Sequence, residues 1–315
     1  MSKFTVHHTT TYTYDGMVYD SANQIMLYPI KDKYQEVIEH QLKITGDPSV
    51  DIFTDYYGNE VGTFTHPEFH NLLRIESIFV VDVKKRPMPD NSIFMSDQWA
   101  ALKQLCHQLP YINFIKQEHF KFNDEVKDVF EIVKDKNQTP LEVAKYLCEY
   151  VFHNFKYIKG VTTVETTIDE IWKLKSGVCQ DFAHILLFLL RSMQIPARYV
   201  SGYICPNKNG MRGEGATHAW AEAYIPDYGW LGLDPTNNCL VDDTHVRLAV
   251  GRNFVDCSPV KGTYKGTSSH QLEVKVSVAY ENDPKPVMEE VNPEIVSQET
   301  QMNSYRRFME MQQQQ

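Results

Sequence analysis

The sequence predicts an α+β protein with two successive domains and a tail. Three observations support this fold class: strand-like segments fill the chain up to residue 83, helical patterns follow, and strand-like segments return after Pro196. We expect an all-β, sandwich-like domain over residues 1–88, a core of helices and an antiparallel sheet over residues 89–281, and a poorly ordered tail over residues 282–315.

Composition narrows the class of protein. With 315 residues the chain is long enough for about two domains, and 42% hydrophobic with 23% charged residues is typical of globular proteins. A net charge of -10 without clustered Lys and Arg argues against a nucleic-acid partner. No apolar run approaches the roughly 20 residues that cross a bilayer, so we expect no membrane partner. The first residues lack the pattern of a signal peptide, so we expect a cytoplasmic location.

The N-terminal domain is predicted from runs of Thr, Tyr and Val. The first run, KFTVHHTTTYTY, ends at the turn signal Asp15-Gly16, which predicts a β-hairpin. Further strands are expected at residues 37–45, 50–57, 61–66 and 72–83. The charged and proline-containing segment KKRPMPDN, residues 84–91, then fits a domain boundary.

The second domain is predicted to begin with helices and to end with strands. Residues 96–109 and 139–155 have helical patterns, with Thr139 placed to cap the second. The segment Thr167 to Glu170 has the pattern of a capping box at the start of a short helix. Strands are then expected at residues 197–204, 218–225, 230–234 and 271–280.

Cys179 stands out among the six cysteines, which are widely spread and lack the spacing of a zinc site. It follows Gly177 closely and opens a long apolar helical pattern, SGVCQDFAHILLFLLRSM. Unpaired N–H groups and the helix dipole favour a thiolate there and can hold an oxyanion. The alternative is that Cys179 is a buried small hydrophobe, the usual fate of a free cysteine.

A base and an orienting carboxylate for Cys179 are available within HAWAEAYIPDYGWLGLDPT. If residues 225–229 form the loop of a hairpin, His218 and Asp234 become diagonal neighbours on one face of the sheet. A shift of one residue would place them on opposite faces. Alternatively, His218 is a core histidine and Asp234 belongs to a turn that ends the strand.

Together these stretches resemble the transglutaminase-like superfamily, specifically its bacterial members with an N-terminal β domain. The resemblance is carried by SGVCQDFAHILLFLLRSMQIPARYVSGY, by THAWAEAYIPDYGWLGLDPTN and more loosely by TYTY near the N-terminus. It implies a papain-like core in which the cysteine-bearing helix packs against an antiparallel sheet. It also implies that Cys179 is the nucleophile, His218 the general base and acid, and Asp234 the residue that orients His218.

The resemblance further implies a thioester on the cysteine and a peptide or protein substrate. We expect hydrolysis of a peptide or isopeptide amide, with two alternatives: acyl transfer, as in protein crosslinking or in arylamine-type enzymes, and a non-catalytic binding module with an idle triad. The family's second oxyanion donor is an aromatic or amide side chain, for which Tyr157 is preferred over Trp172, and Gln180 is placed to reach substrate. We expect no cofactor and no metal, since no calcium-binding loop pattern occurs.

Overall fold

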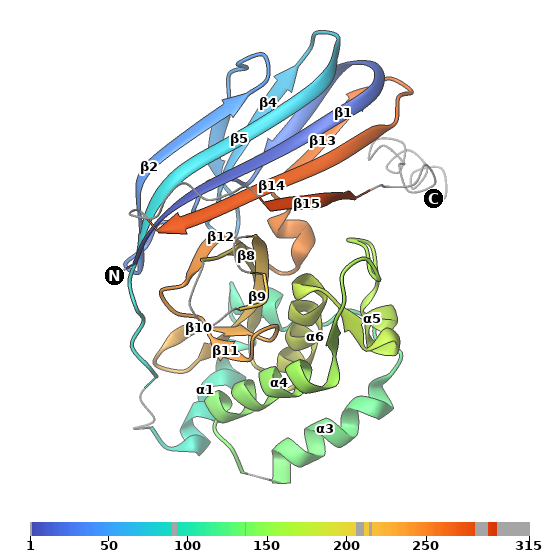
Figure 1. The fold of residues 1–315 in the computed structure, drawn as a ribbon. Coiled ribbons are helices and arrows are strands. Elements are labelled where there is room, and N and C mark those ends of the chain that lie inside the picture. The colour runs from blue at the N-terminus through green and yellow to red at the C-terminus, as the bar shows by residue number, and fades with distance from the viewer. Residues whose placement is uncertain are drawn as a thin grey trace.

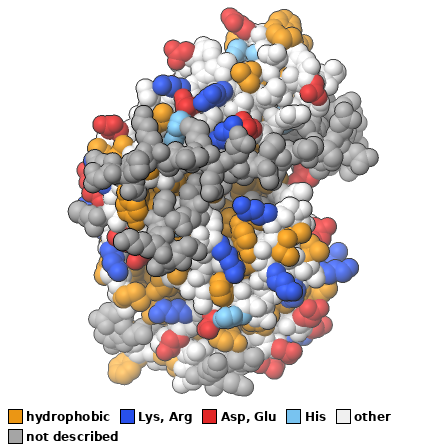
Figure 2. All heavy atoms as spheres, in the orientation of Figure 1, with side chains coloured by type: hydrophobic (Ala, Val, Ile, Leu, Met, Phe, Trp, Pro, Cys, Tyr) orange, Lys and Arg blue, Asp and Glu red, His pale blue; other side chains and the backbone are white. Residues whose placement is uncertain are grey.

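The chain forms a β-rich part stacked on a part that combines helices with a second sheet, as Figure 1 shows. The structure is a computed structural model, and it describes residues 2–89, 93–135, 137–205, 211–213, 216–280 and 289–294. Acidic and basic side chains are interspersed on the face drawn in Figure 2. Within the described ranges, no helix has the length and the apolar character that crossing a membrane requires.

The β-rich part is organised around one long strand, β1 (Ser2–Ile25). The first half of β1 lies between β5 (His70–Val83) and β14 (His270–Tyr280). Its second half lies between β4 (Glu60–His66) and β13 (Val260–Lys265). Three further strands extend these groups at their edges: β2 (Gln35–Ile44) beside β5, β3 (Asp51–Thr54) beside β4, and β15 (Glu289–Glu294) beside β14.

The predicted hairpin at Asp15-Gly16 is wrong. β1 continues through these two residues, and its register against β5 shifts between Thr13 and Val18. The backbone N–H of Asp15 donates to the carbonyl of Ser269 at 3.1 Å, so this part of β1 stays paired with the segment directly before β14. The turn signal therefore marks a bulge that bends the strand instead of a reversal of the chain.

The C-terminal strands lie in the first sheet. We expected residues 89–281 to belong to one core, but β13 and β14 pair with β1 over their length. Strand pairing between distant segments is not encoded in local periodicity, which explains the difference. Of the expected tail, residues 289–294 form β15, and the rest lies outside the described residues.

The second part contains the expected antiparallel sheet. Its strands are β8 (Ala197–Ile204), β9 (Thr217–Ile225), β10 (Gly229–Asp234), β11 (Cys239–Leu240) and β12 (His245–Gly251). They lie in the order β11-β10-β9-β8-β12. The helices are α1 (Met95–Leu105), α2 (Tyr111–Ile115), α3 (Asn123–Asp135), α4 (Pro140–Asn154), α5 (Ile168–Leu174) and α6 (Cys179–Ser192), followed by a 3-10 turn (Phe254–Cys257). Helix α6 packs on β8 and β9, while α4 and α5 pack on α6.

The helix starts follow the expected capping chemistry. Thr139 and Thr167 each form a capping box, in which the threonine hydroxyl accepts from an N–H of the first turn and the glutamate three residues later accepts from the threonine N–H. Helix α6 is buried on nearly every side because it lies between the sheet and the other helices. The predicted helix over 96–109 ends earlier, at Leu105, and α3 has no counterpart in the prediction.

The two parts are joined through the edge of β12. Gln35 donates from Nε2 to the carbonyl of Arg247 and accepts from its N–H, both at 2.8 Å. Asn59 makes the same pair of bonds to Val250, at 2.7 and 2.8 Å. These amide side chains act as partners for an edge strand, and the Arg247 guanidinium adds an ion pair to Asp32 at 2.6 Å. The N-terminal sheet is therefore held in one position over the second part.

Candidate active site

The loop before α6 is built to present Cys179. Strand β6 (Lys156–Tyr157) pairs with β7 (Ser176–Gly177), so Tyr157 lies beside the residues that lead into the helix. Asp181 reaches back from the first turn, and its Oδ2 accepts from the N–H of Val178 and from the Thr162 hydroxyl, both at 2.7 Å. A Cβ on Gly177 would collide with this carboxylate, which explains the glycine. Cys179, partly exposed, is the first residue of α6 and leaves its N–H without a helical acceptor.

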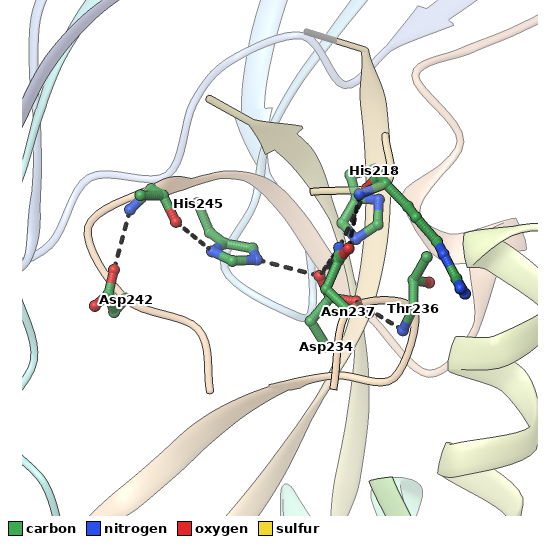
Figure 3. A network of polar contacts seen from close by, with 8 residues as sticks. His218, Asp234, Thr236, Asn237, Asp242 and His245 are labelled. Carbon is green, nitrogen blue, oxygen red and sulfur yellow. Dashed lines mark hydrogen bonds and ion pairs between the residues drawn. The ribbon is translucent and has the colours of Figure 1, made fainter. Parts of the chain in front are cut away.

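His218 and Asp234 meet across the β9–β10 hairpin in the expected register. The last ladder pair is Ala221 with Leu233, which places Asp234 opposite Trp220 and His218 on the diagonal. The distance from Nε2 of His218 to Oδ2 of Asp234 is 2.9 Å, and neither side chain is exposed (Figure 3). The turn after Ile225 thus fixes the geometry of this pair.

Asp234 is saturated with hydrogen bonds. Its Oδ2 accepts from Nε2 of His218, from Nδ2 of Asn237 at 2.7 Å and from Nε2 of His245 at 3.3 Å. Its Oδ1 accepts from the N–H groups of Thr236 and Asn237. Burial alone raises the pKa of Asp234, but the charge of His218 and the hydrogen bonds from both histidines hold that pKa well below its usual range. Asp234 is therefore a fixed anion.

His218 is prepared to carry a proton. Burial alone lowers its pKa, whereas the Asp234 carboxylate and the Cys179 sulfur raise it above the ordinary value. Its Nδ1 is buried and has no hydrogen-bond partner among the described residues. Gly213, at a φ of 82°, covers this nitrogen, and a Cβ there would lie 2.9 Å from it. With Nε2 used by Asp234, Nδ1 is the atom left to exchange a proton with the thiol.

Asn237 and His245 contact Asp234 but were missed from the sequence. His245 is the first residue of β12 and lies 11 residues after Asp234 (Figure 3). Its Nδ1 is 3.1 Å from the Thr244 hydroxyl. Asn237 ends the segment DPTN, where an asparagine three residues after an aspartate is a recognisable turn signal. Within the part of the chain that the structure describes, Asp234, Cys239 and His245 form one group whose potential metal-ligand atoms lie within 4.8 Å of one another. Both oxygens of Asp234 are already engaged there by hydrogen-bond donors.

The three other predicted residues separate into two near the thiol and one away from it. Tyr157 lies near Cys179; burial and this sulfur raise the pKa of the phenol to about 12. Gln180 lines the same cavity as Cys179. Trp172 is a correction: it is buried in the helical core, its Nε1 donates to Glu125 at 2.8 Å, and its ring lies under the Lys175 ammonium. Nε1–H is the only donor of the Trp172 side chain and is used by Glu125, so this side chain is no donor for an oxyanion at Cys179.

A cavity of about 280 Å³ opens beside the thiol. Cys179 and His218 lie on one side of it, and strands β1 and β14 of the N-terminal sheet form another side. The remaining described lining comes from α6, β8, β9, β12, the segment around Phe254 and Val164. The candidate site therefore lies between the two parts of the molecule.

Comparisons with known proteins identify the family of both parts of the chain. Family models match residues 128–235 (transglutaminase-like superfamily) and residues 4–82 (bacterial transglutaminase-like N-terminal region). Uncharacterized protein Rv2569c of Mycobacterium tuberculosis is 32% identical over 299 residues, covering 89% of this chain and 94% of the relative. Protein-glutamine gamma-glutamyltransferase of Pseudomonas aeruginosa is 35% identical over 101 residues, covering 30% of this chain and 15% of that protein.

A solved structure shows the same fold. The crystal structure of a Cytophaga hutchinsonii protein named "Putative Cysteine Protease" superposes with a TM-score of 0.66 at 20% identity, over 90% of this chain and 92% of that chain. The match extends over both the N-terminal sheet and the second part, as its coverage requires. This chain belongs to the transglutaminase-like superfamily, with the bacterial N-terminal region in front of the transglutaminase-like core.

Proposed function

We propose that this protein is a thiol hydrolase that cleaves an amide bond of a peptide through a thioester on Cys179. The observation that carries the proposal is the placement of Cys179 at the first position of α6, in one cavity with His218, whose Nε2 lies 2.9 Å from the buried Asp234 carboxylate. A thiolate next to an imidazolium is the resting state of cysteine nucleophiles that need no metal.

The first half of the reaction uses the thiolate, the imidazolium and two oxyanion donors. The Cys179 sulfur attacks the carbonyl carbon, the S–C bond forms, and the negative charge moves to the carbonyl oxygen. The free N–H of Cys179 and the Tyr157 hydroxyl stabilise that charge. Since burial keeps Tyr157 protonated, its hydroxyl remains a donor at neutral pH. The C–N bond then breaks as Nδ1 of His218 gives its proton to the leaving amine.

The second half needs an acceptor for the acyl group, and we propose water. Water attacks the thioester while Nδ1 of His218 takes one of its protons, and the C–S bond breaks to release the acid. Among the described lining residues of the cavity there is no carboxylate that would attract a lysine ammonium. Water needs no such attraction and can reach the thioester, because Cys179 is partly exposed.

Acyl transfer to an amine is the second candidate. It is favoured by the similarity to the Pseudomonas aeruginosa protein named Protein-glutamine gamma-glutamyltransferase, which covers 30% of this chain and 15% of that protein. The first half of the reaction is the same in both candidates. They differ in whether water or an amine takes the acyl group.

The experiment is a competition between the two acceptors. The protein is incubated with a peptic digest of casein in ¹⁸O-labelled water that contains a fluorescent primary amine, with Cys179→Ala as the blank. We expect ¹⁸O in new carboxyl groups, little fluorescent product and no reaction in the blank. Preferential attachment of the amine would replace hydrolysis with transfer. New carboxyl groups formed equally by Cys179→Ala would exclude Cys179 as the nucleophile.

A further inference from the structure

The N-terminal sheet presents a defined set of side chains to the cavity beside Cys179. Thr10 and Tyr12 alternate along β1 and therefore point to the same face of the sheet. On β14 they are paired with Val274 and Leu272, respectively, and all four line the cavity. We call Thr10, Tyr12, Leu272 and Val274 the β1–β14 wall.

We infer that the β1–β14 wall is a substrate subsite, which holds an uncharged, apolar side chain of a peptide next to the amide that Cys179 attacks. In this subsite Thr10 donates a hydrogen bond to a carbonyl of the same peptide. The inference rests on the proposed function, because it concerns the substrate of that reaction. It gives the N-terminal domain a role in selecting substrate.

The apolar character of the subsite comes from both parts of the molecule. Leu272 and Val274 face it from β14, and Leu248, Phe254 and Val260 add to the apolar lining. Within the described ranges, no Asp, Glu, Lys or Arg lines the cavity. Its volume of about 280 Å³ is several times the roughly 30 Å³ that one water occupies, so an aromatic or branched side chain fits. A charged side chain would lose its hydration against this lining, where the charges of Cys179 and His218 already pair with each other.

The hydrogen-bond donor of the subsite is prepared by a relay through His8. Nδ1 of His8 lies 2.8 Å from the Tyr203 hydroxyl, and Nε2 lies 3.1 Å from Oγ1 of Thr10. Burial and the neighbouring His7 lower the pKa of His8 to about 4, so at neutral pH the ring has one donor and one acceptor nitrogen. A phenol is a stronger donor than an aliphatic hydroxyl, so Tyr203 donates to Nδ1 and Nε2–H donates to Thr10.

This direction of the relay leaves the hydroxyl hydrogen of Thr10 for the cavity. Thr10 makes no other side-chain hydrogen bond within the described part of the chain. Thr10 is buried, with 3% of its surface exposed. Bulk water therefore cannot replace an acceptor that a ligand fails to offer to this hydroxyl. A peptide carbonyl is the acceptor that fits beside an apolar side chain.

The position of the wall is fixed relative to the thiol. Gln35, Asn59 and Arg247 join the two parts through buried hydrogen bonds and one ion pair, and Tyr203 of β8 contacts His8 of β1 directly. The wall and the nucleophile are therefore held at a constant separation. A subsite of this kind selects substrate without a conformational change.

The test measures alkylation of Cys179 by three probes that differ in one side chain: the iodoacetyl derivatives of phenylalanine amide, lysine amide and glutamate amide. Each carries the same reactive group and the same additional carbonyl. We expect the wild-type protein to react about tenfold faster with the phenylalanine probe than with either charged probe, after correction for their rates with free thiol. Plain iodoacetamide reports separately whether Cys179 is a reactive nucleophile.

Two wall variants and two matched controls identify the residues responsible. Val274→Asp should bring the lysine probe to within about twofold of the phenylalanine probe, because the new carboxylate attracts the cation. Thr10→Val should slow all three probes about fivefold relative to iodoacetamide, through loss of one hydrogen bond. Thr11 points to the opposite face of β1, so Thr11→Asp and Thr11→Val should keep the wild-type preferences.

The outcomes separate this inference from the proposed function. Equal rates for the three probes in the wild-type protein, or the same preference in Val274→Asp as in Thr11→Asp, would overturn the subsite while leaving Cys179 as the nucleophile. If iodoacetamide does not select Cys179, the proposed function fails first. If Val274→Asp does not fold, two results still test the subsite: the probe preference of the wild-type protein and the labelling rates of Thr10→Val. The latter substitution changes neither the size nor the charge of the side chain.

Discussion

The substitution Asp234→Asn tests the charge network most sharply, because it keeps the shape of the side chain and removes its charge. The two oxygens of Asp234 accept five hydrogen bonds in a site without exposure to solvent. An asparagine offers one acceptor oxygen, and its NH₂ group faces donors where Oδ2 accepts them now. His218 then loses the anion that keeps it protonated, or it adopts the tautomer with the proton on Nδ1, which cannot take a proton from the thiol.

The expected magnitude follows from the ionisation of thiols. An ordinary thiol is ionised in roughly 1 of 300 molecules at pH 6, whereas a thiolate paired with an imidazolium persists at that pH. A more basic thiolate is also the better nucleophile, which recovers part of the loss. We therefore expect alkylation of Cys179 in Asp234→Asn to fall about 100-fold at pH 6. Near pH 9, where an ordinary thiol is largely ionised, the two proteins should agree within about threefold.

The assay is the second-order rate of iodoacetamide labelling of the Cys179 peptide between pH 5.5 and 9. Asp20→Asn is the matched control, since Asp20 is exposed on β1, pairs with Lys265 and is not among the described residues that line the cavity beside Cys179. Thermal unfolding of each variant shows that the comparison is made on folded protein. A pH profile in Asp234→Asn that coincides with the wild-type profile would refute the role of Asp234.

Three further predictions concern the oxyanion site, the helix start and two histidines with a lowered pKa. Tyr157→Phe should lower turnover of a peptide about 10- to 100-fold through loss of an oxyanion donor. It should leave the rate of iodoacetamide labelling within about twofold, since alkylation forms no oxyanion. Equal losses in both assays would contradict this role of Tyr157. Gly177→Ala should lower the midpoint of thermal unfolding by several degrees, because its Cβ collides with the Asp181 carboxylate; an unchanged midpoint would show that the loop yields freely. His8 is buried and His184 is half-buried, and the pKa of each is lowered to about 4, chiefly by desolvation. Both therefore favour the folded state above their ordinary pKa, and this contribution is lost as pH falls from about 6.5 to 4. Each histidine contributes roughly 3 kcal/mol at most to the free energy of unfolding. In urea titrations across that pH range, the free energy of unfolding of His184→Asn should fall less steeply than that of the wild-type protein. An equally steep fall would contradict the contribution of His184.

Local signals in the sequence predicted the parts of the site that lie close together in the chain. The PDYG turn fixes the register of β9 and β10, and this register alone places His218 on the diagonal from Asp234. Thr139 and Thr167 predicted the starts of their helices because a capping box depends on residues three positions apart. The start of α6 at Cys179 was likewise visible from the apolar pattern that follows it.

The features that escaped prediction depend on contacts between distant segments. His245 reaches Asp234 from β12, and no local pattern distinguishes it from an ordinary strand residue. β14 is separated from β1 by most of the chain, so its place beside β1 and its contribution to the cavity were not foreseen. Asp15-Gly16 misled the prediction because a turn signal inside a long strand also suits a bulge. Trp172 was considered as a donor because its sequence position precedes the nucleophile, but its N–H is used by Glu125.

The most direct test of the central claim is competitive labelling of the native protein with limiting iodoacetamide at pH 7, followed by peptide mapping of all six cysteines. Cys106, Cys148, Cys205 and Cys257 are buried, so Cys239, which is partly exposed like Cys179, is the informative comparison. Burial and the nearby Asp234 and Asp242 raise the pKa of Cys239 to about 12, which keeps it a slow thiol. We predict that Cys179 is labelled at least about tenfold faster than Cys239. Labelling of Cys179 at or below the rate of Cys239 would contradict the claim that an imidazolium and a helix N-terminus activate this sulfur.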